Sequence, residues 1–159
     1  MGRKPKQSIA HIRGGWTIAE LSISYQPATF DLPQISSADD AYKLIRSVWD
    51  NERIHLQEQF YAFFFNRNNR MLGYKLISTG TMRACVVDIK LLAGLALVSQ
   101  CEYVIITHNH PSGCLTPSEQ DKAVTQKIKS ALALIEVKLL DHFIVTAGGY
   151  VSFEEKGWL

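Results

Sequence analysis

Blocks of apolar residues, separated by polar and turn-forming runs, predict a set of buried strands. Residues 59–66 (QFYAFFFN) are apolar on both alternating faces, as in a central strand covered on two sides. The polar run 66–70 favours a turn, so we expect residues 71–78 to return beside this strand as a hairpin partner. Two further segments, 103–107 and 139–146, have the short apolar runs of buried strands.

Two shorter segments extend this pattern. A turn at Gly148-Gly149 leads into a final strand over residues 150–153. Residues 20–25 alternate between polar and apolar side chains, which indicates a half-exposed strand. An exposed strand edge can pair with another chain, so this segment could bind a second copy of the protein in a homodimer, or an extended substrate.

Helical spacing marks three segments between the strands. Ser36 or Ser37 offers an N-cap for the first helix, which we expect to end near Asp50. Asp88 caps the second, which runs to the region of Ser99. This second helix is apolar nearly all round, so we expect it to be buried.

The third helix is expected to begin at Thr116. Pro117 would take the first helical position, and Glu119, three residues after the cap, would complete a capping box. The helix would run to the region of Ile135 and leave Asp121, one turn inside, free for another role. Strands interleaved with helices and hairpins predict an α/β (mixed α+β) fold, with a mixed central sheet flanked by helices.

Length and composition fit one globular domain. The 159 residues are 47% hydrophobic and 20% charged, values typical of folded proteins rather than disordered ones. No apolar run approaches the roughly 18 residues that a membrane span requires, and no hydrophobic leader follows the basic start. We therefore expect a cytoplasmic protein without membrane contact, with a basic, flexible tail over residues 1–15 and one domain over residues 16–159.

The net charge of +2 comes from the amino terminus. Four basic residues and no acidic ones lie in the first thirteen positions, namely Arg3, Lys4, Lys6 and Arg13. Residues 14–159 therefore carry 13 basic and 15 acidic side chains, a net charge of −2. A protein of this charge offers no broad phosphate-binding surface, so any weak contact with nucleic acid would be made by the tail or by a local patch.

The candidate chemistry lies in residues 108–121 (HNHPSGCLTPSEQD). His108 and His110 leave the end of a buried strand two residues apart, so their side chains point to the same side. The proline- and glycine-rich loop that follows can fold the next helix, with Asp121, back onto the strand end. Two imidazoles and one carboxylate, with water in the fourth position, are the ligands of an open catalytic zinc site.

The pattern H-x-H-x₇-S-x-x-D resembles that of the JAMM (MPN-plus, or JAB) metalloproteases, and the fuller string HNHPSG…TPSEQD resembles their RadC-like branch. The resemblance covers residues 37–158 and implies a layered fold like that of cytidine deaminases. It also implies one Zn²⁺ per chain, with His108, His110 and Asp121 as its ligands. The implied activity is that of a zinc metallopeptidase acting on a peptide or isopeptide bond of a protein or peptide substrate.

The same resemblance assigns two catalytic residues. Glu58, in the string EQFYAFFF, matches the glutamate that acts through the metal-bound water, and Ser118 matches the serine that supports the tetrahedral intermediate. From the residues alone, Glu52 and Glu102 also lie near strand ends and are alternatives to Glu58. Asp141-His142, followed by a hydrophobic strand, resembles a further Asp-His pair of the branch.

The sequence also departs from that branch. RadC-like proteins commonly carry an amino-terminal helix-hairpin-helix region linked to DNA, and the segment before the first expected helix is too short for one. Ile89-Lys90-Leu91 stands where the branch usually has Pro-Arg-Glu, and Cys114 lies where a polar residue is more usual. With Cys85 and Cys101, it makes three cysteines without a C-x-x-C pair, which indicates reduced thiols.

Three other functions compete with the metallopeptidase. A cysteine hydrolase would pair Cys114 with His108 or His110. A zinc deaminase would need a glutamate two residues after its histidine and a P-C-x-x-C motif, and the sequence has neither. The third is a non-catalytic metal-binding module associated with DNA repair or DNA processing, as the RadC-like resemblance suggests.

Overall fold

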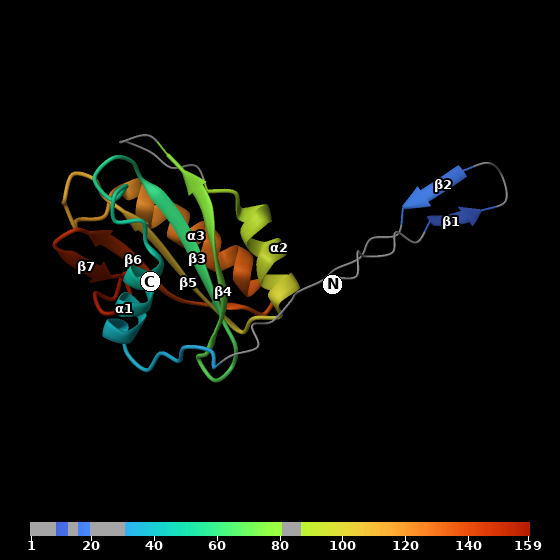
Figure 1. Cartoon of the computed structure of the whole chain (residues 1–159), viewed down its shortest axis with the longest axis horizontal. Helices are drawn as coiled ribbons and strands as arrows, with labels where there is room; N and C mark the ends of the chain where they lie inside the picture. Colours follow the sequence, from blue (N-terminus) through green and yellow to red (C-terminus); the bar gives the residue numbers. More distant parts are fainter. Residues whose placement is uncertain (1–8, 13–15, 20–30, 81–86) are drawn as a thin grey trace.

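The structure is a computed structural model that describes residues 9–12, 16–19, 31–80 and 87–159 (Figure 1). Its elements, in chain order, are β1 (Ile9–Ile12), β2 (Trp16–Ala19), α1 (Ala38–Val48), β3 (Gln59–Phe65), β4 (Met71–Thr79), α2 (Ile89–Ser99), β5 (Tyr103–Asn109), α3 (Glu119–Ala133), β6 (Lys138–Thr146) and β7 (Gly149–Ser152). The expected strands over 59–66, 71–78, 103–107, 139–146 and 150–153 are therefore confirmed.

A five-stranded sheet in the order β4-β3-β5-β6-β7 forms the centre of the fold. β3 pairs antiparallel with both β4 and β5, and β6 pairs antiparallel with β7. β5 and β6 are parallel, a connection that requires a crossover, and α3 provides it. The mixed sheet predicted from the sequence is confirmed.

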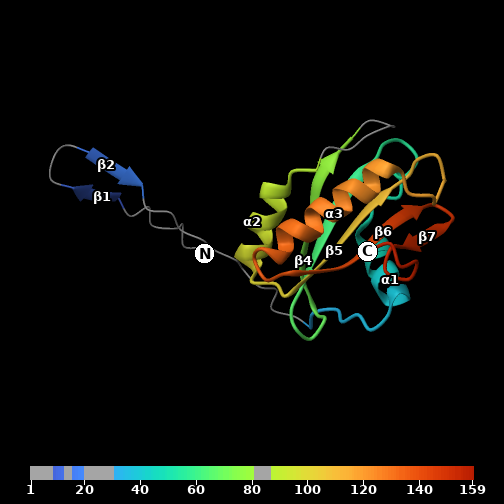
Figure 2. The same cartoon turned by 180° about the vertical axis from the view of Figure 1, so that it is seen from behind.

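Helices cover both faces of this sheet, α2 and α3 on one side and α1 on the other (Figures 1 and 2). β3 shows why its sequence is apolar throughout. Phe60, Ala62 and Phe64 pack in the core beneath α2 and α3, whereas Phe63 and Phe65 pack in the core beneath α1. Each side chain of this strand is therefore buried, and each fully buried aromatic ring contributes about 1.5–3 kcal/mol to folding.

The helix caps agree with the sequence in two cases out of three. Ser37 caps α1 and Asp88 caps α2, and both side chains accept a backbone hydrogen bond in the first turn. The expected cap at Thr116 is wrong, because α3 begins at Glu119 and Ser118 is its N-cap. Ser118 and Asp121 form the capping box, so the expected box from Thr116 to Glu119 is also wrong.

The expectation that α2 is buried nearly all round is also wrong. Leu92 and Ala96 lie in the core, but Leu91 and Leu97 are 40% and 56% exposed. The reason is geometric, since α2 packs through Leu92 and Ala96 against β3, β4 and α3. Its outward apolar residues therefore face solvent.

At the amino-terminal end, β1 and β2 pair as an antiparallel two-stranded sheet, with Ile9 opposite Ala19 and Ile12 opposite Trp16. The sequence pattern gave no sign of this hairpin. The predicted half-exposed strand over residues 20–25 lies outside the described residues, as does Cys85. In the described part of the chain, no helix has the length and apolar character that a bilayer crossing requires.

Candidate metal centre

The two histidines of the H-x-H motif lie at the carboxyl end of β5. His108 is buried beneath α3 and its ring stacks beside that of Phe60, with 6.1 Å between centroids. His110 follows the strand, and its backbone amide donates to the carbonyl of Val145 across 3.1 Å, which keeps the chain beside β6. The Nε2 atoms of the two histidines are 3.0 Å apart. The expected convergence of the imidazoles is confirmed.

Asp121 completes the cluster from the first turn of α3. Its Oδ1 lies 3.1 Å from Nε2 of His108, and its Oδ2 lies 3.6 Å from Nε2 of His110. Oδ2 also accepts hydrogen bonds from the backbone amide and the hydroxyl of Ser118, at 2.7 Å and 2.6 Å. The carboxylate therefore belongs both to the helix cap and to the histidine cluster, in contrast to the prediction that capping would leave it free.

The donor atoms of this cluster fit a small metal ion. A tetrahedral site with bonds of about 2.0–2.1 Å has edges of about 3.3 Å, and the separations of 3.0, 3.1 and 3.6 Å lie on either side of that value. His110 is also in a suitable tautomer. Its Nδ1 lies 2.6 Å from the carbonyl oxygen of Cys114, which can only accept, so Nδ1 carries the proton and Nε2 offers its lone pair. Of the described residues, this group alone could hold a metal ion.

Charge and burial shift the pKa values of these groups in opposite directions. Burial by itself would raise the pKa of Asp121, but its contacts with His108, His110 and Ser118 outweigh burial and hold the pKa of that carboxyl far below its usual range. The hydrogen bond to Asp121 raises the pKa of His110. A metal ion would thus meet a carboxylate that is already ionised.

Glu58 comes close to the same cluster from another strand. It directly precedes β3, and its carbonyl accepts the amide of Gly80 across 2.8 Å. Phe60, two residues after Glu58, pairs with His108, and the amide of Gln59 donates to the side chain of Asn109 across 2.7 Å, so Glu58 enters the sheet beside the end of β5 that carries the histidines. Burial raises the pKa of Glu58, against the charges of His108 and His110, which lower it.

Asn109, between the two histidines, has a function that sequence reasoning missed. Its side chain is fully buried on the opposite face of β5, where Nδ2 donates to the carbonyls of Ile54 and Gln57 at 2.8 and 2.9 Å. Its Oδ1 accepts the backbone amide of Gln59 at 2.7 Å. Asn109 thereby ties the segment that carries Glu58 to the strand that carries the histidines. Strand alternation predicts that its side chain lies on the other face of the strand from the histidines, but no local pattern identifies its hydrogen-bond partners.

His142 of β6 lies directly behind His108. Its Nε2 is 2.8 Å from Nδ1 of His108, and its side chain is fully buried. Burial holds the pKa of His142 well below its ordinary value. The sequence marked Asp141-His142 only through a resemblance, and the contact with His108 depends on the parallel pairing of β5 with β6.

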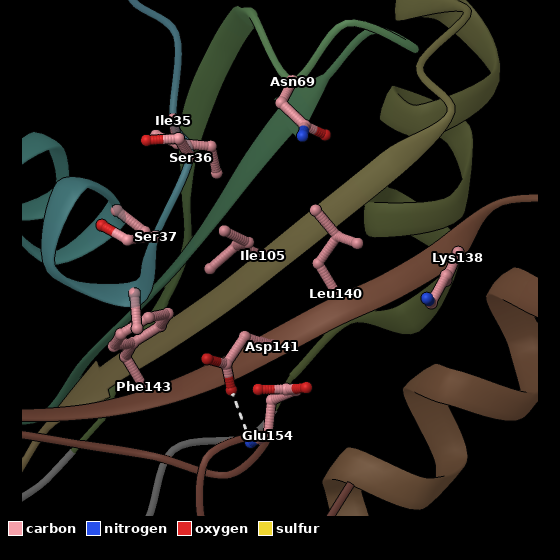
Figure 3. A pocket seen from close by; sticks show the side chains of 12 residues that line it. Ile35, Ser36, Ser37, Asn69, Ile105, Lys138, Leu140, Asp141, Phe143 and Glu154 are labelled. Carbon is pink, nitrogen blue, oxygen red and sulfur yellow. Dashed lines mark hydrogen bonds between the residues drawn. The ribbon is translucent and has the colours of Figure 1, made fainter.

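The neighbouring Asp141 points to the opposite face of the sheet. There it lines a pocket beside the start of α1, together with Ile105 of β5 and Glu154 beyond β7 (Figure 3). None of the three clustered ligands lines this pocket. The hydrogen bond between His110 and Cys114 is made by the carbonyl oxygen of Cys114 and does not involve its thiol.

Comparison with known proteins places the chain in a family. Residues 35–158 match the family model of the RadC-like JAB domain. A UPF0758 protein of Flavobacterium johnsoniae is 37% identical over 126 residues, which cover 79% of this chain and 54% of that protein. One of Xanthomonas campestris is 33% identical over 141 residues, 89% of this chain and 63% of that protein.

The chain belongs to the RadC-like JAB domain family. Its five-stranded mixed sheet with three helices is the fold of that domain. A third relative, from Vibrio cholerae, is 38% identical over 103 residues, 65% of this chain and 46% of that protein. The chain thus spans about half to two thirds of the length of these relatives.

Proposed function

We propose that the protein is a zinc-dependent hydrolase of JAMM type that cleaves a peptide or isopeptide bond. The observation that supports this proposal is the convergence of the ligand atoms of His108, His110 and Asp121 within 4.8 Å of one another, with Glu58 near enough for their charges to act on its carboxyl. These three residues would hold the ion. Bound zinc acts as a Lewis acid and lowers the pKa of a coordinated water toward neutrality.

Glu58 would move the proton in this reaction. A glutamate beside the cluster can accept a proton from the attacking water and deliver it to the leaving amine. Its burial raises its pKa, which favours a carboxyl that can hold the proton between the two transfers. Glu58 directly precedes β3, and the electrostatic influence of His108, His110 and Asp121 on its carboxyl supports a position near the substrate carbonyl that the site would bind.

Ser118 would stabilise the oxyanion that develops on the substrate. Its hydroxyl donates to Asp121 in the structure, so it must turn away from the carboxylate to donate to substrate. A hydrogen-bond donor in this role contributes about 10²–10³ in rate in measured enzymes. Its backbone amide also donates to Asp121 and keeps the carboxylate in place when the hydroxyl turns.

Metal content and hydrolysis test this proposal together. Protein purified without added metal should contain one zinc per chain, and both His108→Ala and Asp121→Ala should lose it. A panel of peptides and isopeptide-linked conjugates then serves as substrate. Glu58→Gln should keep the zinc and lose hydrolysis, whereas Glu52→Gln, an exposed glutamate of the preceding turn, should retain both.

Two results would contradict the proposal in different ways. Absence of zinc even after reconstitution would remove the metal site. Zinc that is bound but supports no hydrolysis of any conjugate would instead favour the non-catalytic metal-binding module. Such a module, if it acts on DNA, should bind DNA with an affinity that falls steeply with salt and depends on Arg3, Lys4 and Lys6.

A further inference from the structure

A row of buried polar side chains runs behind the candidate metal ligands. Nδ1 of His108 lies 2.8 Å from Nε2 of His142, and Nδ1 of His142 lies 2.6 Å from the hydroxyl of Thr125. That hydroxyl lies 2.5 Å from the backbone carbonyl oxygen of Asp121. The row therefore starts at the main chain of one ligand and ends at the ring of another.

The chemistry of the groups fixes the direction of each hydrogen bond. A carbonyl oxygen only accepts, so the single proton of the Thr125 hydroxyl points at Asp121. Thr125 must then accept a proton from Nδ1 of His142. A neutral His142 protonated on Nδ1 has a lone pair on Nε2, which accepts from Nδ1 of His108. A neutral His108 protonated on Nδ1 has its lone pair on Nε2, the atom that faces His110 and Asp121.

Burial supports the neutral form of His142. Its side chain has no solvent exposure, and the partners of its two ring nitrogens among the described residues are Thr125 and His108, neither of which is an acid. With one proton available to its ring, His142 can complete the row in one direction only.

The ring of His142 is also held firmly in place. Phe153 stacks on it with 4.6 Å between centroids, and the Phe153 amide donates to the carbonyl of His142 across 3.0 Å. On the opposite face of the sheet, the carboxylate of Asp141 also helps to hold the backbone of His142 in place. It accepts hydrogen bonds from the amide of His142, the hydroxyl of Ser152 and the amide of Glu154 (Figure 3). The last of these contacts is the dashed line of the figure. Asp141 and His142 thus connect residues 152–154 to His108 of the candidate metal site.

We propose that Thr125 and His142 are positioning residues that fix the tautomer of His108, so that its Nε2 presents a lone pair to the metal. This inference rests on the metal site of the proposed function. It adds a role for two side chains, from α3 and β6, that do not touch the ion. Backbone carbonyls and carboxylates commonly accept the second ring proton of metal-binding histidines. Here a second histidine, His142, is the acceptor, and its own proton is bonded to Thr125 of α3, the helix that carries Asp121.

The tautomer can be measured directly in the zinc-free full chain. Long-range ¹H–¹⁵N spectra of histidine-labelled protein should show His108 protonated on Nδ1 in the wild type. Thr125→Val removes the acceptor of the row, so His142 can shift its proton to Nε2 and the His108 signal should move toward the Nε2-protonated form. Thr125→Ser keeps the hydroxyl and should retain the wild-type pattern.

Zinc affinity gives the second readout. Competition with a chelator should show zinc bound about 10–100-fold more weakly by Thr125→Val and by His142→Phe, the usual range for loss of such support. Thr125→Ser should stay near the wild-type affinity. Thr107→Val is the matched control, because it removes another fully buried hydroxyl, one with no hydrogen-bond partner among the described residues.

The outcomes separate this inference from the proposed function. An Nε2-protonated His108 in the zinc-free wild type would contradict the inference that Thr125 and His142 fix its tautomer. An unchanged tautomer and zinc affinity in folded Thr125→Val would contradict it too, and neither result would affect the proposed metal site. A wild-type protein that shows the Nδ1 tautomer but binds no zinc would overturn the proposed function instead. If His142→Phe fails to fold, the Thr125→Val and Thr125→Ser pair decides.

Discussion

The hydroxyl of Ser118 donates to Oδ2 of Asp121 across 2.6 Å, and the amide of Asp121 donates back to the same hydroxyl across 3.1 Å. The two residues are the N-cap and the third residue of α3, so this contact starts the helix. The same carboxylate faces His108 and His110. The start of α3 and the candidate metal site therefore share one side chain.

Ser118→Ala should lower both stability and zinc affinity. Loss of an N-cap hydroxyl typically reduces the free energy of unfolding by about 1 kcal/mol, as urea denaturation would measure. Zinc affinity should also fall, because Asp121 loses one of the donors that orient it. Ser37→Ala removes the equivalent cap of α1 and should cost similar stability without changing zinc affinity. Equal zinc affinity in the two variants would contradict the shared role.

The ionisation of His110 should depend on Asp121. In zinc-free protein the carboxylate raises the pKa of His110, so an NMR titration should place it above about 6.5, the ordinary value for histidine. Asp121→Asn removes this cause, and the pKa should fall. Glu119→Gln, which neutralises an acid paired with Lys122 in the same turn, should leave it unchanged.

The sign of the resulting stability change follows from linkage. Because the pKa of His110 is higher in the folded state, its stabilising effect is complete below about pH 6.5 and is lost as the pH rises through the folded pKa. The stability gap between wild type and Asp121→Asn should therefore narrow between pH 6 and pH 9. A gap that widens over this range would contradict the assignment.

Asn109→Ala should destabilise the fold and also impair the proposed reaction. It leaves the carbonyls of Ile54 and Gln57 and the buried amide of Gln59 without their partner, which costs about 1–3 kcal/mol in the free energy of unfolding. The segment before β3 would loosen, so hydrolysis should fall while zinc content stays at one per chain. Asn68→Ala, in the exposed turn between β3 and β4, is the control. Full activity of Asn109→Ala would show that this tie does not position Glu58.

The two described cysteines should differ in reactivity. Hydrogen bonds from the backbone and hydroxyl of Thr116 lower the pKa of the exposed Cys114 thiol, whereas burial raises that of Cys101. Iodoacetamide at neutral pH should therefore alkylate Cys114 much faster than Cys101, as peptide mass spectrometry would measure. In Cys114→Ser, Cys101 should stay unmodified until the protein is denatured. Comparable rates at the two thiols in native protein would contradict this difference.

Local patterns in the sequence located most of the fold and the cluster. The apolar run of β3 predicted a strand buried on both faces, and the spacing of His108 and His110 predicted imidazoles on one side. Both signals depend on strand alternation, which requires no knowledge of distant residues. Asp88 was identified as the cap of α2, and Ser36 and Ser37 were left as alternatives for α1, of which the structure has Ser37.

The errors arose where tertiary contacts choose between local alternatives. The string TPSEQD holds two overlapping capping boxes, Thr116 with Glu119 and Ser118 with Asp121, and propensity does not separate them. The contacts of Asp121 with His108 and His110 accompany the second capping box, and a comparison of the two boxes within this string does not include them. His142 lies 34 residues from His108, so their contact depends on the pairing of β5 with β6.

All three candidate ligands come from residues 108–121, the end of β5 and the start of α3. A bound ion would therefore link the start of α3 to the end of β5 across one short connection, and would not involve α1 or α2. Closing so short a loop restricts the unfolded chain only modestly. The fold therefore does not depend on a bound metal ion. Evolution can replace the ligands, and protein design can exchange the ion, while the fold is retained.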